Sequence, residues 1–356
     1  MEQKLENPPP SRRQFASDNY SGICPEAWET LAAANAGHAS PYGNDAWTEQ
    51  ACDALRELFE TDCEVYFVSS GTAANALALS SLCQSYHSIL CHEAAHVETD
   101  ECGAAEFFSN GTKVLVLPGE HGKVRPQFVE QAVSRRSDIH YPKPRVLTVS
   151  QATELGTVYS IAELAELGQL CRRLGVQLHM DGARAANALA TLNVAPKEMT
   201  WKIGVDVICF GGAKNGLPIG EAVVFFRKEA AEEFAYRCKQ AGQLTSKMRF
   251  MAAPWLGLLK SGAWLENARR ANRSAELLER ELRSVPGLEI LHPRQANAVF
   301  VHFPTQATQE LRRRGWSFYE FIGGGARLMC SWDTTENDVR AIGADIRQVL
   351  SGPTVA

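Results

Sequence analysis

The chain has 356 residues, 45% hydrophobic and 22% charged, with a net charge of −5. This is the composition of a folded globular protein, and the charge gives no reason to expect nucleic acid or an anionic membrane as a partner. No apolar run is long enough to span a bilayer, and residues 1–13 are polar and Pro-rich rather than a secretory signal. The ten cysteines are spread without a CxxC pair, so we expect a reducing, cytoplasmic location.

A chain of this length exceeds what one compact core usually holds, and we expect two domains. The first two thirds contain seven short β-rich runs, several of them continuously apolar, as in strands covered on both faces. These predicted strands are 64–70, 88–92, 113–117, 145–151, 177–181, 205–211 and 221–226. Helical patterns lie between many of them, including residues 45–59 and a helix that opens with the capping box Ser160–Glu163 and stops at Gly175.

This alternation predicts a mainly parallel, seven-stranded α/β sheet. The last run follows its predecessor too closely for a helical crossover, so we expect it to pair antiparallel or lie at an edge. After residue 226 the pattern becomes helical, with a long helix over 263–282, and a smaller α+β unit follows. Its predicted strands and helices are near 288–291, 298–303, 327–332, 306–314 and 335–350. The predicted division is a disordered segment 1–14, a large domain 15–255 and a small C-terminal domain 256–356.

An acid and an amine each follow an apolar strand. Asp181 opens the sequence DGAR, and Lys214 lies in GGAKNG, just past the strand 205–211. This pair suits pyridoxal phosphate (PLP), because a lysine can hold the aldehyde as a Schiff base while an acid keeps the pyridine nitrogen protonated. The alternative for Lys214 is an ordinary loop lysine. The alternatives for Asp181 are a helix N-cap and a strand-end aspartate that pairs with Arg184. Arg184 can also contact the cofactor from the same turn.

A phosphate site is predicted at the sequence SSGTAAN, residues 69–75, which ends the first strand and starts a helix. Backbone N–H groups at a helix N-terminus bind anions, so Gly71 and Thr72 are candidate phosphate ligands. A plain helix N-cap is the alternative. The sequence contains neither GxGxxG nor GxxxxGK[ST], so dinucleotide and nucleoside triphosphate binding lose their usual support.

Residues 92–96 read HEAAH and match the zinc motif HExxH. That motif binds zinc when both histidines lie one turn apart on a helix, with the glutamate as base. Here it directly follows the strand 88–91, which favours a strand end at His92. We therefore expect no metal and interpret His96 as covering one face of the pyridine ring. A zinc hydrolase that uses His92, Glu93 and His96 is the alternative.

Arg327 follows three glycines at the start of a strand in the small domain. A planar guanidinium binds a carboxylate through two parallel hydrogen bonds, which an amino-acid substrate requires. A surface salt bridge is the alternative for this arginine.

Together these sequences resemble the L-threonine aldolase branch of the fold-type I PLP enzymes, which is grouped with the aromatic β-eliminating lyases. The resemblance runs from about residue 15 to about residue 350. The matching stretches are SDN (17–19), PYGND (41–45), SGTAAN (70–75), AH (95–96), HMDGAR (179–184), GGAKNG (211–216) and KMR (247–249). The resemblance implies the PLP-dependent transferase-like fold and a homo-oligomer, dimer or tetramer, with active sites at the subunit interface.

The activity that the resemblance implies is reversible retro-aldol cleavage of L-threonine, L-allo-threonine or another β-hydroxy-α-amino acid, such as phenylserine, into glycine and an aldehyde. Lys214 carries the cofactor, Asp181 pairs with the pyridine nitrogen and His96 stacks on the ring. The base that removes the β-hydroxyl proton is His96 or a water near His140, which looks like the family's second histidine. A satisfied histidine before a strand is the alternative for His140.

The resemblance also implies which residues bind the phosphate and the substrate. The phosphate is bound by Gly71 and Thr72, helped from a neighbouring subunit by Lys239 or Arg249. Tyr42 lines the site from the dimer interface. The substrate carboxylate is held by Ser17, Arg184 and Arg327.

Two positions depart from the family pattern. Ala213 stands where many relatives have Thr or Ser, and QATE (151–154) replaces the ENTH of another branch. Both departures are compatible with cofactor binding, but they do not determine which substrate side chain the site accepts. β-Elimination, transamination and racemisation would use the same residues and are alternatives, as is a homologue that binds the cofactor without catalysis.

Overall fold

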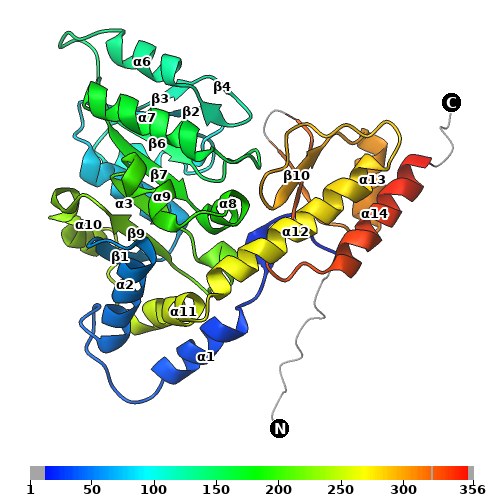
Figure 1. Cartoon of the computed structure of the whole chain (residues 1–356), viewed down its shortest axis with the longest axis horizontal. Helices are drawn as coiled ribbons and strands as arrows, with labels where there is room; N and C mark the ends of the chain where they lie inside the picture. Colours follow the sequence, from blue (N-terminus) through cyan, green and yellow to red (C-terminus); the bar gives the residue numbers. More distant parts are fainter. Residues whose placement is uncertain (1–12, 322–323, 352–356) are drawn as a thin grey trace.

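The computed structural model describes residues 13–321 and 324–351. Two β-sheets organise the chain: a seven-stranded sheet wrapped by helices, and a three-stranded sheet that the long helix α12 joins to it (Figure 1). Of the segment 1–14, predicted to be disordered, residues 1–12 lie outside the described residues, and Gln14 forms a β-bridge with Ser317. None of the described helices is both long and apolar enough to cross a membrane.

The large sheet confirms the seven predicted strands. Their order is β1-β9-β8-β7-β6-β2-β3. β9 is antiparallel to both of its neighbours, as its short connection to β8 predicted, and the other pairs are parallel. The strands are β1 (Glu64–Val68), β2 (His87–His92), β3 (Lys113–Leu117), β6 (Lys143–Ser150), β7 (Gln177–Gly182), β8 (Val207–Phe210) and β9 (Glu221–Phe225).

Helices cover both faces of this sheet, which explains why its strands are continuously apolar. Along β1, Phe67 packs into the core on one face and Val68 into the core on the other. The first face is covered by α2 (Ala46–Phe59), α6 (Pro126–Ser134), α7 (Ile161–Leu174), α8 (Ala185–Leu192) and α11 (Arg249–Lys260). The second face is covered by α3 (Gly71–Leu82), α4 (His96–Thr99), α5 (Ala104–Phe108) and α10 (Phe234–Gln240).

The predicted capping box of α7 is present. Ser160 Oγ accepts from Glu163 N at 3.2 Å, and Glu163 Oε2 accepts from Ser160 N at 2.6 Å. Gly175 ends the helix with a φ of 67°, a conformation that favours glycine. The remaining short elements of the large unit are η1 (Asp18–Tyr20), α1 (Pro25–Ala34), β4 (Gly119–Glu120), β5 (Lys123–Val124), α9 (Pro196–Met199), η2 (Trp201–Ile203), η3 (Ala213–Asn215) and η4 (Lys228–Ala231).

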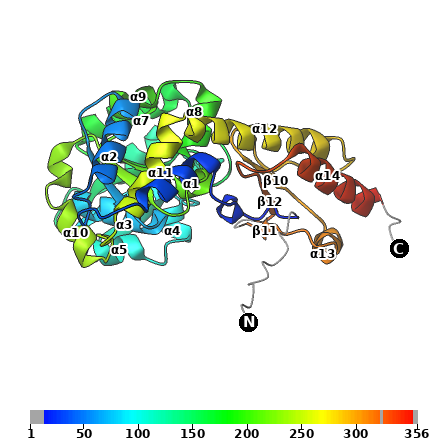
Figure 2. The same cartoon turned by 90° about the horizontal axis from the view of Figure 1, so that it is seen from below.

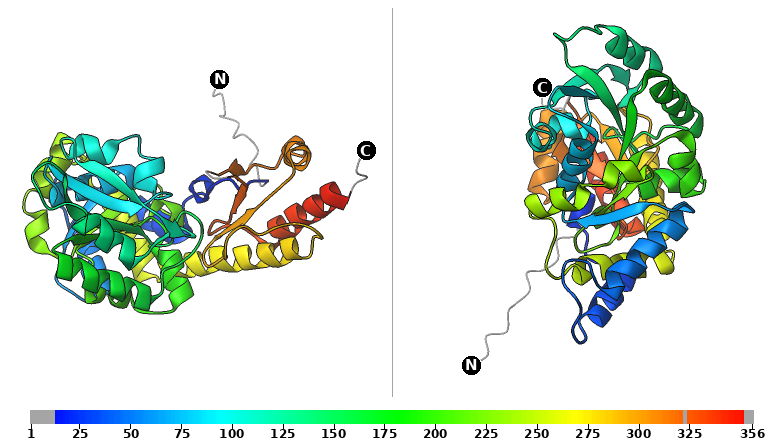
Figure 3. Two further views of the ribbon diagram at one scale, coloured as in Figure 1. Left: turned by 90° about the horizontal axis from the view of Figure 1, so that it is seen from above. Right: turned by 90° about the vertical axis from the view of Figure 1, so that its left-hand side faces the viewer.

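The second sheet is antiparallel, with the order β10-β12-β11. It consists of β10 (Ala298–Val301), β11 (Tyr319–Glu320) and β12 (Ala326–Met329). One face packs against α12 (Ala263–Arg283), α13 (Thr305–Arg313) and α14 (Glu336–Ser351), and Figure 3 shows α12 and α14 on the same side of the sheet. The strand predicted at 288–291 is wrong in extent, because only an isolated bridge between Ile290 and Val301 forms there.

The first described residues belong to the small sheet. Phe15 N donates to Ser317 O, its carbonyl accepts from Met329 N, and its side chain packs in the small-sheet core. Figure 2 shows this segment, in dark blue, beside β11 and β12. The boundary predicted between residues 255 and 256 falls inside α11, which packs on α1 and α2. We therefore propose that the division lies near Gly262, between α11 and α12, and that both ends of the chain contribute to the small domain.

Candidate active site

Asp181 and Lys214 both lie at the edge of the large sheet where its parallel strands end. Ser150 of β6 lies beside Asp181 of β7, which lies beside Cys209 of β8. Lys214 follows β8 on the turn η3. The carboxyl edge of a parallel sheet is where open α/β folds bind their ligands.

Asp181 is a buried carboxylate held by two N–H donors. Its Oδ1 accepts from Ala183 N at 2.9 Å, and its Oδ2 accepts from Asn75 Nδ2 at 2.8 Å. Burial alone raises the pKa of Asp181, but the charge of His96, the Ala183 hydrogen bond and the charge of Lys214 outweigh burial and hold the pKa below its ordinary value. Asp181 is therefore ionised at neutral pH and suited to a cationic heterocycle.

The backbone packs closely around Lys214. A Cβ added to Gly211 would overlap the carbonyl oxygen of Ala183, so only glycine fits this approach to the turn. Behind the turn, Glu221 Oε2 accepts from Gly212 N at 2.6 Å, and burial raises the pKa of Glu221 to about 7. The half-buried Lys214 amine forms no hydrogen bond or ion pair with any described residue, which leaves it available to a ligand.

A hydrogen-bonded chain that sequence reasoning missed links His96 to Asp181. His96 Nδ1 lies 2.8 Å from Glu101 Oε1, and the same oxygen accepts from Asn75 Nδ2 at 2.8 Å. Asn75 Nδ2 also donates to Asp181. Burial alone lowers the pKa of His96, but the Glu101 hydrogen bond and the Asp181 charge raise it above its ordinary value. Nothing local in the sequence distinguishes Glu101 from an exposed acid.

The HEAAH sequence does not form a zinc-binding helix. His92 ends β2, and its Nδ1 accepts from Ala94 N at 2.9 Å, whereas His96 begins α4. Glu93 is exposed. The group of potential metal ligands found among the described residues is a different one: His96, Glu101 and Asp181. The zinc hydrolase alternative therefore lacks the helical geometry that it requires.

Arg184 forms a buried ion pair with Asp18 through two hydrogen bonds. Its Nε and Nη2 donate to the two Asp18 oxygens at 2.7 and 2.9 Å, and the side chains are 12% and 1% exposed. Asn297 Nδ2 adds a third donor to Asp18 at 3.1 Å. Ser17 is buried next to this pair and caps η1 through its Oγ. The alternative in which Arg184 pairs with Asp181 is therefore wrong.

Arg327 has no acidic partner among the described residues. Its Nη2 donates to Ala16 O at 3.3 Å, and its buried Nε has no hydrogen-bond partner in this part of the chain. The rings of Tyr319 and Phe321 have their centres 5.6 and 5.2 Å from its Cζ. Burial, followed by the charge of Arg184, lowers the pKa of Arg327 to about 10. A guanidinium in this position can accept the carboxylate of a ligand.

Helix α3 begins where the phosphate site was predicted. Ser70 is its N-cap, and the Ser70 Oγ accepts from Ala73 N at 3.3 Å. A Cβ added to Gly71 would meet nothing within 4 Å, so the space beside this helix end is open. The hydroxyl satisfies only one of the first N–H groups, so the N-cap and an anion site that includes Thr72 are compatible.

The residues assigned to the neighbouring subunit lie around the loop between α1 and α2. Lys239 Nζ is 4.6 Å from the centre of the Tyr42 ring, and the Arg249 guanidinium donates to Gly37 O at 3.4–3.5 Å. Among the described residues, none of the three forms a hydrogen bond or ion pair with the predicted cofactor residues. Their role across an interface stays a prediction.

His140 lies at the opposite end of β6 from the site. It is exposed, in the turn before the strand, and its N donates to Asp138 Oδ1 at 3.0 Å. After His140, the eight residues of β6 run from Lys143 to Ser150, and Ser150 lies beside Asp181. This strand length corresponds to roughly 26 Å. One chain does not bring His140 to the site, so its predicted role requires a second copy.

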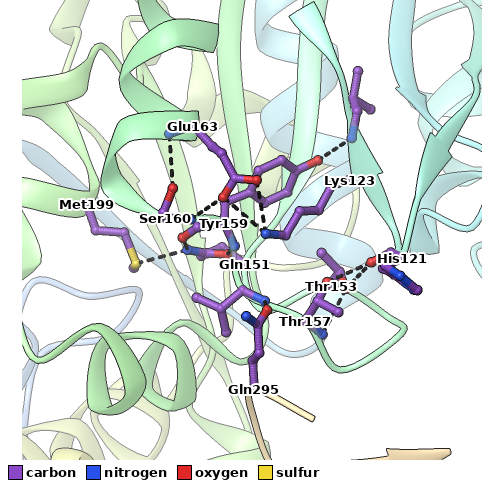
Figure 4. Close-up of polar contacts among 12 residues, drawn as sticks. His121, Lys123, Gln151, Thr153, Thr157, Tyr159, Ser160, Glu163, Met199 and Gln295 are labelled. Atoms are coloured by element: carbon purple, nitrogen blue, oxygen red, sulfur yellow. Dashed lines mark hydrogen bonds and ion pairs between the residues drawn. The ribbon is translucent and has the colours of Figure 1, made fainter. Parts of the chain in front are cut away.

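A polar network fixes the loop that follows β6 (Figure 4). The Gln151 side-chain amide accepts from Tyr159 N at 3.0 Å and donates to Tyr159 O at 2.9 Å. The Tyr159 hydroxyl accepts from Val124 N at 2.6 Å, which ties the loop to the β4–β5 hairpin. The same loop carries Glu154, whose Oε1 accepts from His96 N at 3.1 Å. The QATE departure therefore places a hydrogen-bonded carboxylate beside His96.

Comparisons with known proteins identify the relatives of this chain. The sequence profile described as "Beta-eliminating lyase" matches residues 14–306. The chain is 59% identical over 340 residues to the low specificity L-threonine aldolase of a Pseudomonas species, covering 95% of this chain and 98% of that protein. The low specificity L-threonine aldolase of Pseudomonas aeruginosa is 59% identical over 339 residues, with coverage of 95% and 98%.

A solved structure leads to the same group. The structure of the Leishmania major threonine aldolase matches with a TM-score of 0.89 at 26% identity, covering 95% of this chain and 99% of that one. These matches confirm the fold and the resemblance predicted from the sequence. The chain belongs to the beta-eliminating lyase family.

Proposed function

We propose that the protein is a low-specificity L-threonine aldolase. It uses PLP to cleave L-threonine, L-allo-threonine and related β-hydroxy-α-amino acids, such as phenylserine, reversibly into glycine and an aldehyde. Relatives with that name are 59% identical to nearly the whole chain, which supports the proposal. The observation that carries it is an ionised Asp181 near a Lys214 amine that no described residue engages, at one edge of the sheet.

The donor set of the site fits PLP. A carboxylate that its surroundings keep ionised suits a protonated pyridine nitrogen. A half-buried lysine amine on a glycine-flanked turn suits the aldehyde. The open N-terminus of α3, with Gly71 and Thr72, suits the phosphate.

When bound at Lys214, PLP supplies an electron sink for the bond electrons released as the substrate Cα–Cβ bond breaks. Asp181 holds a proton at the ring nitrogen by its negative charge. Asn75 and Ala183 fix the Asp181 carboxylate through their N–H groups. His96 covers the ring and excludes water from that side.

Arg327 binds the substrate carboxylate. Arg184 already donates from Nε and Nη2 to Asp18, so this pair of donors cannot also bind the substrate carboxylate. The Arg327 guanidinium, without an acidic partner among the described residues, is the group that can form two parallel bonds to a carboxylate. Ser17 and the Arg184 Nη1 complete the carboxylate site. Fixing the carboxylate orients the bond that breaks.

His96 takes the proton of the β-hydroxyl. Its Nδ1 is engaged by Glu101, so Nε2 is the nitrogen that faces the substrate. The alternative base is a water held near His140 of a second copy.

The working form is a cytoplasmic homo-oligomer, a dimer or a tetramer, in which a neighbouring copy completes the site. Lys239 or Arg249 of that copy helps to bind the phosphate, and Tyr42 lines the site from the interface. Their positions around the loop between α1 and α2, together with the placement of His140 at the far end of its own β6, support this arrangement.

Lys214→Ala tests the proposal. We expect no aldehyde from L-threonine or phenylserine, while the far-UV circular dichroism spectrum and the unfolding midpoint stay close to those of the wild type. Lys260→Ala, at the exposed end of α11, is the matched control and keeps full activity. Normal aldehyde release by Lys214→Ala would refute the assignment. Pyruvate and ammonia from a β-substituted alanine, with no aldehyde from L-threonine, would identify β-elimination instead.

A further inference from the structure

Glu101, between α4 and α5, is buried and lies next to the residues assigned above. It is 2% exposed. Its Oε1 faces two donors, His96 Nδ1 at 2.8 Å and Asn75 Nδ2 at 2.8 Å. Its Oε2 has no hydrogen-bond partner in the described part of the chain. Burying a carboxylate that has one unpaired oxygen lowers the stability of the fold. Its contacts with His96 and Asn75 therefore indicate its role.

The Glu101 hydrogen bond fixes the orientation of the His96 imidazole. A histidine bonded to a carboxylate through Nδ1 carries its proton on that nitrogen and presents Nε2 as an acceptor. The His96 backbone is held separately, because its N donates to Glu154 Oε1 at 3.1 Å. The His96 side chain is 30% exposed, so without Glu101 the ring is free to turn toward solvent.

Asn75 joins Glu101 to Asp181. Its Nδ2 carries two hydrogens and donates one to each carboxylate, both at 2.8 Å. One oxygen of each carboxylate and one His96 nitrogen consequently lie within 4.8 Å of one another. Glu101 and Asn75 therefore connect His96, which stacks on the ring, to Asp181, which pairs with the ring nitrogen.

We propose that Glu101 is the positioning residue of His96: it holds the Nδ1 proton, aims Nε2 at the substrate hydroxyl and, through Asn75, sets the distance of the imidazole from Asp181. This inference rests on the proposed function. Glu101 does not touch the substrate and acts through His96.

The charged groups that face His96 determine how the proposal can be measured. Glu101 and Asp181 raise the pKa of His96, Lys214 lowers it, and the Glu154 carboxylate lies at its backbone. Removing the Glu101 charge therefore lowers the pKa of His96. The acidic limb of the rate profile, where His96 becomes protonated, moves to lower pH with it.

Glu101→Gln is the test variant, because it keeps the size and one acceptor oxygen but removes the charge. Glu98→Gln, an exposed position on α4, is the matched control. The imidazole of His96 is titrated by NMR in the purified holoenzyme without substrate, and His96→Asn identifies its signal among the nine histidines. We expect a lower His96 pKa in Glu101→Gln and no change in Glu98→Gln. Identical titrations in wild type and Glu101→Gln would overturn the proposal.

A double-mutant cycle separates positioning from a merely structural role. Glu101→Gln should lower kcat/KM for phenylserine by roughly 10- to 100-fold, the effect of losing a charged hydrogen-bond partner. In the His96→Asn background the same change should add little, because the residue it positions is gone. An equal loss in both backgrounds would overturn the proposal.

Two further outcomes keep the experiment decisive. Glu101→Asp retains the charge and should recover part of the rate. If Glu101→Gln fails to fold, Glu101→Asp is titrated instead: its shorter side chain lengthens the hydrogen bond to His96 Nδ1, and a His96 pKa equal to that of the wild type would overturn the proposal. A wild-type protein that releases no aldehyde would sink the proposed function alone, since the NMR titration tests the coupling of Glu101 to His96 without substrate.

Discussion

The buried ion pair between Asp18 and Arg184 can be probed with Asp18→Asn. Burial alone raises the pKa of Asp18, but Arg184, through its charge and its hydrogen bonds, outweighs burial and holds the pKa below its ordinary value. The asparagine keeps the size of the side chain and one acceptor oxygen. It leaves the Arg184 charge without its counter-charge, at a side chain that is only 12% exposed.

The expected cost follows from burial. Removing one partner of a buried ion pair lowers the free energy of unfolding by about 3–5 kcal/mol. Because asparagine retains one acceptor, we expect the lower end, about 3 kcal/mol. The entropy of unfolding, about 2.1 cal/mol/K per residue, comes to about 0.75 kcal/mol/K for 356 residues, so the unfolding midpoint should fall by about 4 °C.

The assay is thermal unfolding followed by circular dichroism at a fixed cofactor concentration. Asp53→Asn is the control, because it breaks an exposed pair with Arg56 whose side chains are 58% and 34% exposed. Asp53→Asn should lower the free energy of unfolding by less than about 1 kcal/mol. Equal midpoints for the two variants would refute the reasoning that burial gives the Asp18 pair its strength.

Three further predictions concern packing, pH and substrate binding. Gly168→Ala should lower the free energy of unfolding by about 1–3 kcal/mol, because its Cβ would overlap the carbonyl oxygen of Ile203. Gly22→Ala, whose Cβ meets nothing within 4 Å, is its control, and equal midpoints would count against the clash. Burial lowers the pKa of His179 from 6.5 to about 4, so the stability that its neutral form contributes is present above pH 6.5 and is lost as the pH falls toward 4. Urea unfolding between pH 4 and 8 should show this loss, about 3 kcal/mol for the site, and His179→Gln should reduce it; an unchanged slope would contradict the burial effect. Arg327→Lys should raise KM roughly 10-fold or more with a smaller change in kcat, since an ammonium cannot form the two parallel bonds, and an unchanged KM would remove Arg327 from the substrate site.

The sequence was sufficient for the features that depend on local pattern. The apolar runs and the short link before β9 predicted the large sheet, because burial on both faces leaves a continuous signal. Asp181 and Lys214 could be paired because each directly follows a strand, and parallel strands end at one edge. Two-residue strands such as β11 are too short to show a period.

Contacts between distant segments were not predictable in this way. Asp18 and Arg184 are 166 residues apart, and the local sequence around either residue does not predict the other as its partner. Glu101 meets Asn75 only because α3 and the segment between α4 and α5 pack on the same face of the sheet. The placement of Phe15 in the small-sheet core depends likewise on strands near the other end of the chain.

The pairing of Phe15 with Met329 has a consequence for how the protein is made. At about 5–20 residues per second, a ribosome needs roughly 15–60 s to translate the stretch from residue 15 to residue 329. During that interval the core that the Phe15 ring enters is incomplete, which leaves the ring accessible to chaperones. A nascent chain stalled after β9 but before β12 would therefore carry all seven strands of the large sheet and an N-terminal segment that still lacks its partner strand.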